Sequence, residues 1–335
     1  MPTKPHDEDV YFQGEGSPLV TVLLPVYNGE PFLRLAVDSV VRQTYKNLEI
    51  ILINDGSTDT SQETLTSFAA RDSRIILLNR ENRGIVESLN EGLALAKGKY
   101  VARMDADDIS MPRRLARQVA YLEKHPDVVL LGVRQYEDHL SRWLHSKVRG
   151  VRNCTWALLF LNYIGHPGVM FRMDTLRKHG LSYRSEYQYV EDYKLWCEIT
   201  CHGWADVLNE PLLFYRRHDL AASKTSSGLQ AQRDRRVSIE QLFNRLNVDM
   251  SDLETASVRN WVCGLNSRMF KSEVFNGLSD EDRAAIHVMF QEYSLRNGLS
   301  APEYLKQVGM RPAFLGPWWG MRYLYRSIKY SIRKV

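Results

Sequence analysis

Short apolar runs alternate with longer stretches of helical periodicity between residues 19 and 103. Runs rich in β-branched and aliphatic residues are typical of strands, and apolar residues that return every three or four positions, as Leu33, Val37 and Val40 do, are typical of helices. We expect Pro25 to end the first strand and Asp59 to cap the second helix. The predicted strands cover 19–24, 48–53, 74–78 and 99–103, and the predicted helices cover 30–43, 59–70 and 84–96.

This alternation predicts an α/β fold with a mostly parallel central sheet flanked by helices. In such sheets ligands bind beyond the carboxyl ends of the strands. Three polar segments follow predicted strands, and we expect them to converge on one crevice. They are Pro25-Val26-Tyr27-Asn28, Asn54-Asp55 and Asp105-Ala106-Asp107.

The pattern divides the chain into three regions. Residues 1–16 are polar and contain a Glu-x-x-Tyr-x-Gln-Gly string, so we expect a flexible tail or a remnant of an expression tag. Residues 17–225 form the predicted α/β domain. Residues 226–335 form a predicted helical extension, with breaks near Asn247, Gly277 and Gly298.

Composition narrows the class of protein. With 44% hydrophobic and 25% charged residues, the 335-residue chain is ordinary for a globular protein, and the net charge of +4 is too mild to argue for nucleic acid as a partner. The four cysteines form no CxxC pair, and no apolar segment is long enough to cross a bilayer or to act as a leader. We therefore expect a reducing, cytoplasmic compartment.

The string Arg103-Met104-Asp105-Ala106-Asp107-Asp108 places three carboxylates within four positions after a predicted strand. Such carboxylates repel one another unless a cation lies among them. Oxygen ligands suit Mg²⁺ or Mn²⁺, which also hold substrate phosphates. A metal site is one interpretation of this string, and a solvated turn is the other.

Several single residues are each open to two interpretations. Asp55 could hydrogen-bond a nucleobase or cap the following helix, and Tyr27 could stack on a base or pack internally. Glu191-Asp192 begins a helix-like run, where the carboxylates could favour the helix dipole or supply a general base. His218 follows Arg216-Arg217 and could be a metal ligand or, with the two arginines, a diphosphate clamp.

Read together, these segments resemble glycosyltransferase family 2, whose members have the GT-A fold. The resemblance covers roughly residues 18–225, in the family's order, and its strength lies in the number of strings. The strings are Pro25-Val26-Tyr27-Asn28, Asn54-Asp55-Gly56-Ser57-Thr58-Asp59, Asn82-Arg83-Gly84, Met104-Asp105-Ala106-Asp107-Asp108, His166-Pro167-Gly168, Glu191-Asp192-Tyr193-Lys194-Leu195-Trp196 and Tyr215-Arg216-Arg217-His218.

The resemblance implies a GT-A, Rossmann-like sheet and a nucleotide-sugar donor, most often UDP-linked. The nucleotide would be held by Pro25, Tyr27, Asp55, Arg83 and Asp105. Asp107 and His218 would bind Mn²⁺ or Mg²⁺, with Arg216 and Arg217 on the diphosphate. Asp192 would be the catalytic base, with Glu191 and His166 on the acceptor side.

The resemblance also implies inversion at the anomeric carbon, a displacement that needs one base. Processive polysaccharide synthases of the family carry a Gln-x-x-Arg-Trp string after that base. Here Arg142-Trp143 precedes Asp192 and has His139 where glutamine belongs, which indicates addition of a single sugar. The alternatives are a catalytically idle sugar-nucleotide-binding protein and a sugar-nucleotide pyrophosphorylase; the latter is disfavoured because no Gly-rich phosphate loop follows the first strand.

Residues 318–335 combine aromatic and basic side chains. On a helix, Arg322, Arg326, Lys329 and Arg333 form one stripe beside an apolar face. This pattern is typical of a helix lying on an anionic membrane surface, and the alternative is a helix docked on the protein itself. We expect an enzyme at the inner face of the cell membrane that acts on a glycan or polyprenyl-diphosphate-linked glycan in bacterial polysaccharide or lipopolysaccharide biosynthesis.

Overall fold

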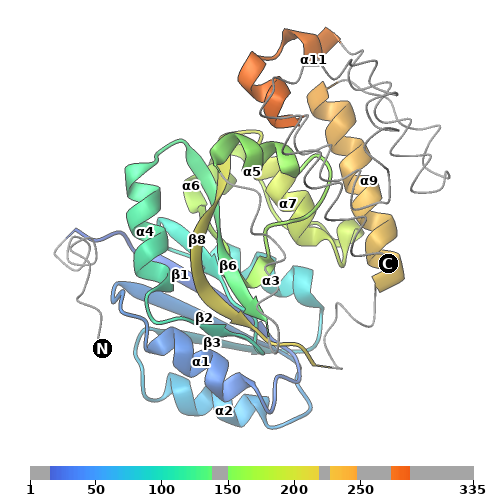
Figure 1. Ribbon diagram of the computed structural model, residues 1–335. Coiled ribbons are helices and arrows are strands. Elements are labelled where there is room, and N and C mark those ends of the chain that lie inside the picture. The colour runs from blue at the N-terminus through green and yellow to red at the C-terminus, as the bar shows by residue number, and fades with distance from the viewer. Residues whose placement is uncertain (1–15, 138–149, 219–226, 247–272, 287–335) are drawn as a thin grey trace, which may run out of the picture. The chain divides into compact units, whose positions relative to one another are not determined.

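The computed structural model describes residues 16–137, 150–218, 227–246 and 273–286. The chain divides into two compact units (Figure 1). The first comprises Met1–Thr155 and Asn162–Arg233, and the second comprises Trp156–Leu161 and Asp234–Val335. The predictions about the tail, about His139 and Arg142-Trp143, about the break near Gly298 and about residues 318–335 lie outside the described residues.

An eight-stranded sheet forms the centre of the first unit, in the order β3-β2-β1-β4-β7-β6-β8-β5. The first four strands run parallel, whereas β7 is antiparallel to both β4 and β6, and β5 is antiparallel to β8. The strands are β1 (Val20–Val26), β2 (Leu48–Asp55), β3 (Ile75–Arg80), β4 (Tyr100–Arg103), β5 (Ile109–Ser110), β6 (Val128–Glu137), β7 (Met170–Arg172) and β8 (Trp204–Tyr215).

Helices lie on both faces of the sheet (Figure 1). The helices of the first unit include α1 (Leu33–Val41), α2 (Ser61–Ala69), α3 (Ile85–Leu95), α4 (Arg114–Lys124), α6 (Met173–His179) and α7 (Glu191–Ile199), with short 3₁₀ turns η2 (His166–Gly168) and η3 (Ser185–Tyr187). The helix α5 (Val151–Ala157) follows β6. The predicted α/β class and mostly parallel central sheet are confirmed.

Alternation along β1 divides the core between the two faces. Val20, Val22 and Leu24 join a buried cluster with residues of α1, α2 and α4. Leu23 points the other way, toward α3, where a Cβ on Gly92 would lie 2.1 Å from the Leu23 Cδ1 atom. Both faces of β1 and β2 are covered, which is why these strands read as nearly continuous apolar runs.

Pro25 does not end the first strand as predicted, because β1 continues to Val26. The Leu23 carbonyl accepts a hydrogen bond from the Met104 amide, so the backbone polar groups of Leu23 face β4. The Pro25 nitrogen, two residues later, faces the same side, where β4 has already ended at Arg103. Proline therefore costs no ladder hydrogen bond here.

The chain order creates a switch point beside β1. From β1 it passes outward to β2 and β3, then returns to β4 on the other side of β1. In sheets of this kind a ligand binds at the carboxyl ends of the strands on either side of such a switch point. Tyr27 follows β1 and Asp105 follows β4.

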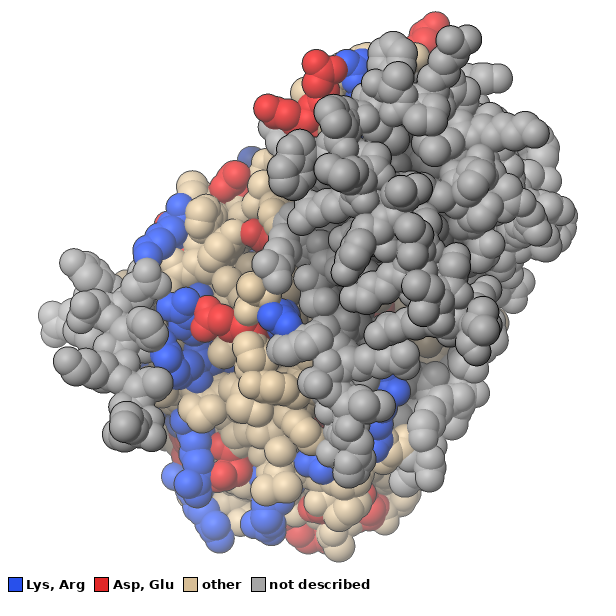
Figure 2. Space-filling view, viewed as in Figure 1, with Lys and Arg blue, Asp and Glu red and all other residues tan. Residues whose placement is uncertain are grey.

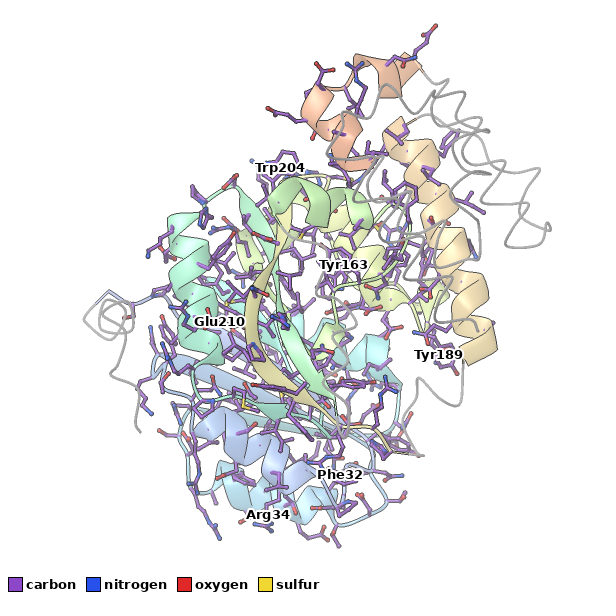
Figure 3. All side chains as sticks on the ribbon, viewed as in Figure 1. Phe32, Arg34, Tyr163, Tyr189, Trp204 and Glu210 are labelled. Carbon is purple, nitrogen blue, oxygen red and sulfur yellow. The ribbon has the colours of Figure 1, made fainter. Side chains whose placement is uncertain are left out.

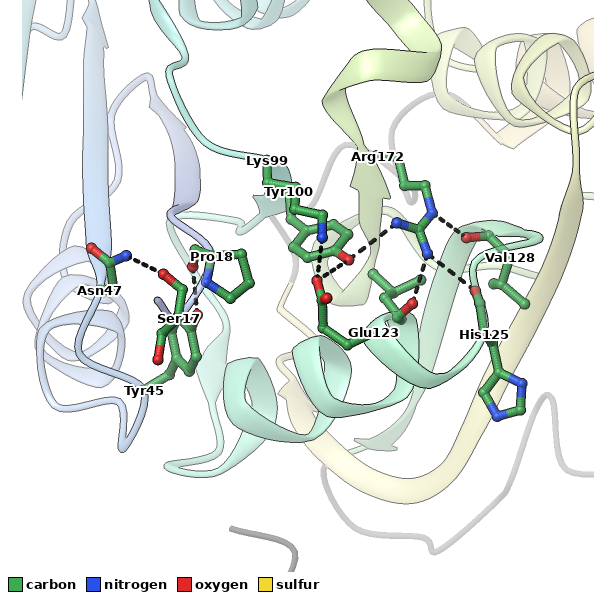
Figure 4. A network of polar contacts seen from close by, with 11 residues as sticks. Ser17, Pro18, Tyr45, Asn47, Lys99, Tyr100, Glu123, His125, Val128 and Arg172 are labelled. Atoms are coloured by element: carbon green, nitrogen blue, oxygen red, sulfur yellow. Dashed lines mark hydrogen bonds and ion pairs between the residues drawn. The ribbon is translucent and has the colours of Figure 1, made fainter. Parts of the chain in front are cut away.

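Arg172 on β7 holds the end of α4 against the sheet (Figure 4). Its guanidinium donates to the carbonyls of Leu122 (2.7 Å), His125 (3.1 Å) and Val128 (2.8 Å), and to the Tyr100 hydroxyl (3.1 Å). It thereby supplies donors to carbonyls in the last turn of α4 and in the segment that leads into β6.

The second unit contains α9 (Ser227–Leu246), which begins in the first unit, and α11 (Glu273–Gly277), followed by a helical segment at 280–286. α11 ends at Gly277, where a break was predicted, and the break predicted near Asn247 lies outside the described residues. Within this unit the Trp156 indole donates to Asp282 at 2.9 Å. Among the described residues, none of the helices combines the length and apolar character that crossing a bilayer requires. Basic and acidic side chains are intermixed on the face drawn in Figure 2.

Candidate active site

The ends of β1 and β2 are joined by side chains of the loops that follow them. The Asn28 amide donates to the Ser57 hydroxyl (3.0 Å), and the Asn28 side-chain oxygen accepts from the Thr58 amide (2.8 Å). Asn28 has a φ of 51°, a left-handed conformation that asparagine tolerates. Asp59 accepts from the Ser61 amide at the start of α2 (3.0 Å), close to the predicted cap.

Asp55 ends β2 and fixes the loop that leads into α3. Its two carboxylate oxygens accept hydrogen bonds from the amides of Arg83 (2.9 Å) and Gly84 (2.8 Å), and its Oδ1 atom lies 2.9 Å from an Arg80 guanidinium nitrogen. The carboxylate is almost fully buried. Asp55 therefore does not cap the following helix, α2, which was one of its two interpretations, but holds the start of α3.

Three other residues predicted to bind the nucleotide lie in β1, directly after it, or in the loop that Asp55 holds. Tyr27 is 55% exposed, directly after β1, so the interpretation of its ring as internal packing is wrong. Arg83 is exposed beside the backbone that Asp55 holds. Pro25 lies inside β1, paired with Ile53 of β2.

The three carboxylates that follow β4 form a compact cluster. Single oxygen atoms of Asp105, Asp107 and Asp108 all lie within 4.8 Å of one another. The buried Arg103 guanidinium forms an ion pair with Asp105. The string is therefore a partly buried acidic cluster rather than a solvated turn.

Asp108 was predicted as one of the three carboxylates of this string but was given no role of its own, and it is the most buried member of the cluster. Its Oδ1 atom accepts from the Arg216 amide at 2.9 Å, whereas its Oδ2 atom has no hydrogen-bond partner among the described residues. Burial raises the pKa of Asp108 to about 8, and the charges of Asp105 and Asp107 add to this effect.

His218 and Arg216 come to this cluster from the end of β8. The His218 Nε2 atom lies 2.8 Å from the Asp107 Oδ2 atom, and the Arg216 Nε atom donates to the Asp107 carbonyl at 2.9 Å. Phe32, labelled in Figure 3, packs against both, with its ring centroid 5.0 Å from that of His218 and 4.6 Å from the Arg216 guanidinium carbon. Arg217 is exposed.

The donor set fits a divalent cation. It offers carboxylate oxygens in close mutual contact, a buried oxygen without a partner, and an imidazole in direct contact with one carboxylate. Burial is the main cause of the raised pKa of Asp108, and a cation would offset the repulsion by Asp105 and Asp107 that adds to it. Oxygen-rich sites of this kind suit Mg²⁺ or Mn²⁺.

Glu191 and Asp192 begin α7, and neither forms a simple surface cap. The Asp192 carboxylate accepts from the Asn162 side chain (2.9 Å) and from the Tyr193 amide (2.7 Å). Burial raises the pKa of Asp192, and the charge of Asp105 raises it further, whereas these hydrogen bonds and Arg103 lower it. Burial, helped by the charge of Asp192, raises the pKa of Glu191 to about 7.

Arg103 connects the acidic cluster with the start of α7. Its charge lowers the pKa of Asp105, Asp192 and Glu191, in addition to its direct ion pair with Asp105. Because the same carboxylates influence one another electrostatically, the segments after β4 and before α7 lie in one region of the first unit. The sequence offers one signal for Arg103, a charged residue at the end of an apolar strand, and none for Asn162.

His166 lies in the same region, at the start of η2. Its Nε2 atom is 2.9 Å from the Tyr183 hydroxyl, and its ring packs edge-on against Trp196 of α7. Burial and the charge of Arg103 hold the pKa of His166 well below its usual value, so the ring is neutral. The buried Arg114 donates to the carbonyls of Pro167 (2.6 Å) and Arg103 (3.1 Å), which fixes this turn to the end of β4.

Comparisons with known proteins agree with this geometry. Residues 21–180 match the family model "Glycosyl transferase family 2". An uncharacterized glycosyltransferase of Haemophilus influenzae is 35% identical over 266 residues, which cover 73% of this chain and 80% of the relative. The glycosyltransferase EpsE of Bacillus subtilis is 33% identical over 252 residues, which cover 70% of this chain and 85% of the relative.

Two solved structures share the fold at low identity. S. aureus TarS 1-349 in complex with UDP-GlcNAc has a TM-score of 0.55 at 14% identity, with 85% of this chain and 93% of the 1-349 chain covered. Mannosyltransferase PcManGT from Pyrobaculum calidifontis, in complex with GDP-Man and Mn²⁺, has a TM-score of 0.54 at 17% identity, with 93% and 87% covered. From the motifs in order, the sheet that positions them and these relatives, we conclude that the chain belongs to glycosyltransferase family 2 and has the GT-A fold.

Proposed function

We propose that this protein transfers one sugar, with inversion, from a UDP-linked donor to a hydroxyl group of a glycan or lipid-linked glycan. The observation that carries the proposal is that Arg103 interacts with the acidic cluster after β4 and with Asp192 at the start of α7. A site with donor-binding groups and a general base close together is what a direct displacement requires.

The donor would lie across the carboxyl ends of β1, β2 and β4. Tyr27 offers an exposed ring for the base, and Asp55 sets the backbone beside Arg83. Asp105 would approach the ribose. Arg216 and Arg217 would contact the diphosphate from the end of β8, where Arg216 already lies against the acidic cluster.

Asp107 and His218 would hold the divalent metal, with Asp108 close enough to take part. When bound, Mn²⁺ or Mg²⁺ would neutralise negative charge on the diphosphate leaving group. Family membership favours a transferase over an idle binding protein or a pyrophosphorylase, the two alternatives considered from the sequence.

Asp192 would act as the general base. It removes the proton from the acceptor hydroxyl while that oxygen forms a bond to the anomeric carbon. The bond from that carbon to the diphosphate breaks on the opposite face, and the nucleoside diphosphate leaves with the electron pair. The raised pKa of Asp192 makes it a stronger base than an exposed aspartate, and Asn162 holds its carboxylate in place. Glu191 and the neutral His166 would line the acceptor side.

A screen of donors tests this function. Thermal unfolding would be followed with UDP- and GDP-linked sugars, each with Mn²⁺ or Mg²⁺, for the wild type and Asp192→Asn. A bound donor raises the unfolding temperature. We expect a UDP-sugar to stabilise both proteins and only the wild type to transfer the sugar. Full transfer by Asp192→Asn, or stabilisation by no UDP-sugar, would contradict the proposal.

We further propose a bacterial surface-glycan acceptor and a location at the inner face of the cell membrane, supported by the basic aromatic pattern of residues 318–335. Co-sedimentation with anionic liposomes, compared between the full chain and a variant lacking these residues, measures this association. Equal sedimentation of both would favour the alternative in which the segment docks on the protein.

A further inference from the structure

Tyr189 adopts a backbone conformation that its side chain disfavours. Its φ is 74°, in the left-handed region, and it lies between η3 and α7, three residues before Asp192. Among the described residues the other non-glycine residue with positive φ is Asn28, a type that tolerates this region. For a bulky side chain the conformation costs free energy, and a glycine would avoid this cost.

Core packing does not account for a tyrosine at this position. Three neighbouring tyrosines, Tyr183, Tyr187 and Tyr193, are buried, with exposures of 2%, 7% and 0%. The Tyr189 side chain is instead partly exposed (Figure 3). The free energy that burial of an aromatic ring ordinarily supplies is therefore incomplete here, while the cost of the backbone remains.

The Arg233 side chain contacts both the turn and the Tyr189 ring. The Arg233 guanidinium donates to the Gln188 carbonyl, and its central carbon lies 5.6 Å from the centroid of the Tyr189 ring. The hydrogen bond fixes the backbone before Tyr189, and the cation–π contact fixes the ring itself. The result is an oriented and partly exposed aromatic surface directly before Glu191 and Asp192.

We propose that Tyr189 is a specificity-determining residue that stacks against a pyranose ring of the acceptor. The inference rests on the proposed function, because it gives the class of molecule that Asp192 would deprotonate. An aromatic face packs well on the C–H face of a sugar, and its hydroxyl can take part in a hydrogen bond at the rim. A ring held in advance loses little conformational entropy on binding. The strained turn would place that ring beside the base.

Two variants separate the ring from the backbone. Tyr189→Gly removes the ring and relieves the backbone, so it should fold at least as well as the wild type, while Tyr189→Phe keeps the aromatic face. The probes are methyl glycosides of glucose, galactose and N-acetylglucosamine, with binding followed by saturation-transfer NMR and KM and kcat measured with the best UDP-sugar.

We expect Tyr189→Gly to raise the KM for the acceptor glycoside by about tenfold, which corresponds to about 1.4 kcal/mol. The donor KM should be unchanged, and Tyr189→Phe should stay within about threefold of the wild type. Arg233→Met should raise the acceptor KM in the same direction as Tyr189→Gly, since the ring is then less restrained.

An unchanged acceptor KM in Tyr189→Gly would overturn the proposal. A fall in kcat with KM unchanged would also overturn it, because Tyr189 would then position Asp192 rather than bind the acceptor. If the wild type binds a nucleotide sugar but none of the glycosides, this inference fails and the proposed function stands. If it binds no nucleotide sugar, the proposed function itself fails.

Discussion

The His218 Nε2 atom lies 2.8 Å from the Asp107 Oδ2 atom, a contact between residues 111 positions apart. Asp107 lies between β4 and β5, and β5 pairs antiparallel with the end of β8, so this pairing brings Asp107 to His218, which follows β8. Phe32 from the start of α1 packs on the histidine ring and limits its movement. The segments that carry Asp107, His218 and Phe32 form the centre of the candidate metal site.

This contact predicts how the protein binds metal. We expect Asp107→Ala and His218→Ala each to weaken Mn²⁺ binding by at least about tenfold, because each removes a candidate ligand. Titration followed by electron paramagnetic resonance, with UDP present, measures the affinity. His179→Ala is a matched control, since His179 is exposed and stacks on His202 instead. Excess chelator should stop turnover, and added Mn²⁺ or Mg²⁺ should restore it; turnover that survives chelation contradicts this role.

Asp55 is expected to affect both stability and donor binding. Asp55→Asn removes the charge that is paired with Arg80 and weakens the hold on the Arg83 and Gly84 amides. We expect a loss of about 1–3 kcal/mol in the free energy of unfolding, because the site is buried. The Kd for a UDP-sugar should rise at least about tenfold.

Chemical denaturation and calorimetric titration measure these two effects of Asp55→Asn. Asp72→Asn is the control. Asp72, like Asp55, pairs with an arginine (Arg74), but it lies in the loop before β3 and not at the carboxyl end of a parallel strand. Donor binding lost at unchanged stability would show that Asp55 contacts the nucleotide without supporting the loop.

Glu191 should make stability depend on pH. Burial and the charge of Asp192 raise its pKa from 4.5 to about 7 in the folded state. Below pH 4.5 the group is protonated whether the chain is folded or unfolded. Between pH 4.5 and about 7 the unfolded chain releases this proton first, so the contribution to stability is lost as pH rises, by up to about 3 kcal/mol.

Glu191→Gln does not titrate, and its stability relative to the wild type should therefore increase between pH 5 and pH 8. Urea denaturation at the two pH values measures this. In the Asp192→Asn background, the stability change caused by Glu191→Gln should depend less on pH, because the charge of Asp192 no longer raises the pKa of Glu191. A relative stability that is equal at both pH values would mean that Glu191 titrates normally.

Arg172 is expected to stabilise the fold without acting in the site. Arg172→Met removes hydrogen bonds to the Leu122 and His125 carbonyls at the end of α4, to the Val128 carbonyl at the start of β6 and to the Tyr100 hydroxyl (Figure 4). We expect a loss of about 2–4 kcal/mol in the free energy of unfolding, since four hydrogen bonds to one guanidinium would be lost. Thermal unfolding measures it, and donor affinity should not change.

The control for Arg172 is Arg42→Met. Arg42 forms an exposed pair with Asp38 on one face of α1, a kind of contact that contributes at most about 0.5 kcal/mol. Equal effects of the two substitutions would show that the carbonyls at the end of α4 find other partners, such as water.

The sequence by itself determined the elements of the half of the sheet that contains β1 to β4, because hydrophobic periodicity and turn residues are local properties. The strands that became β1 to β4 and the polar strings after them were recognisable without contacts. The end of the first strand was misplaced at Pro25, since whether a proline nitrogen lacks a partner depends on how far the neighbouring strand extends.

Tertiary structure alone decided which charges meet. Nothing local indicates that β7 inserts antiparallel between β4 and β6, or that Asn162 reaches Asp192. The burial of Arg103 and Asp108 and the contact of Phe32 with His218 are equally products of packing. The pKa values of the buried carboxylates depend on the distances between charges and on the exclusion of water. Both arise when segments far apart in the chain pack together.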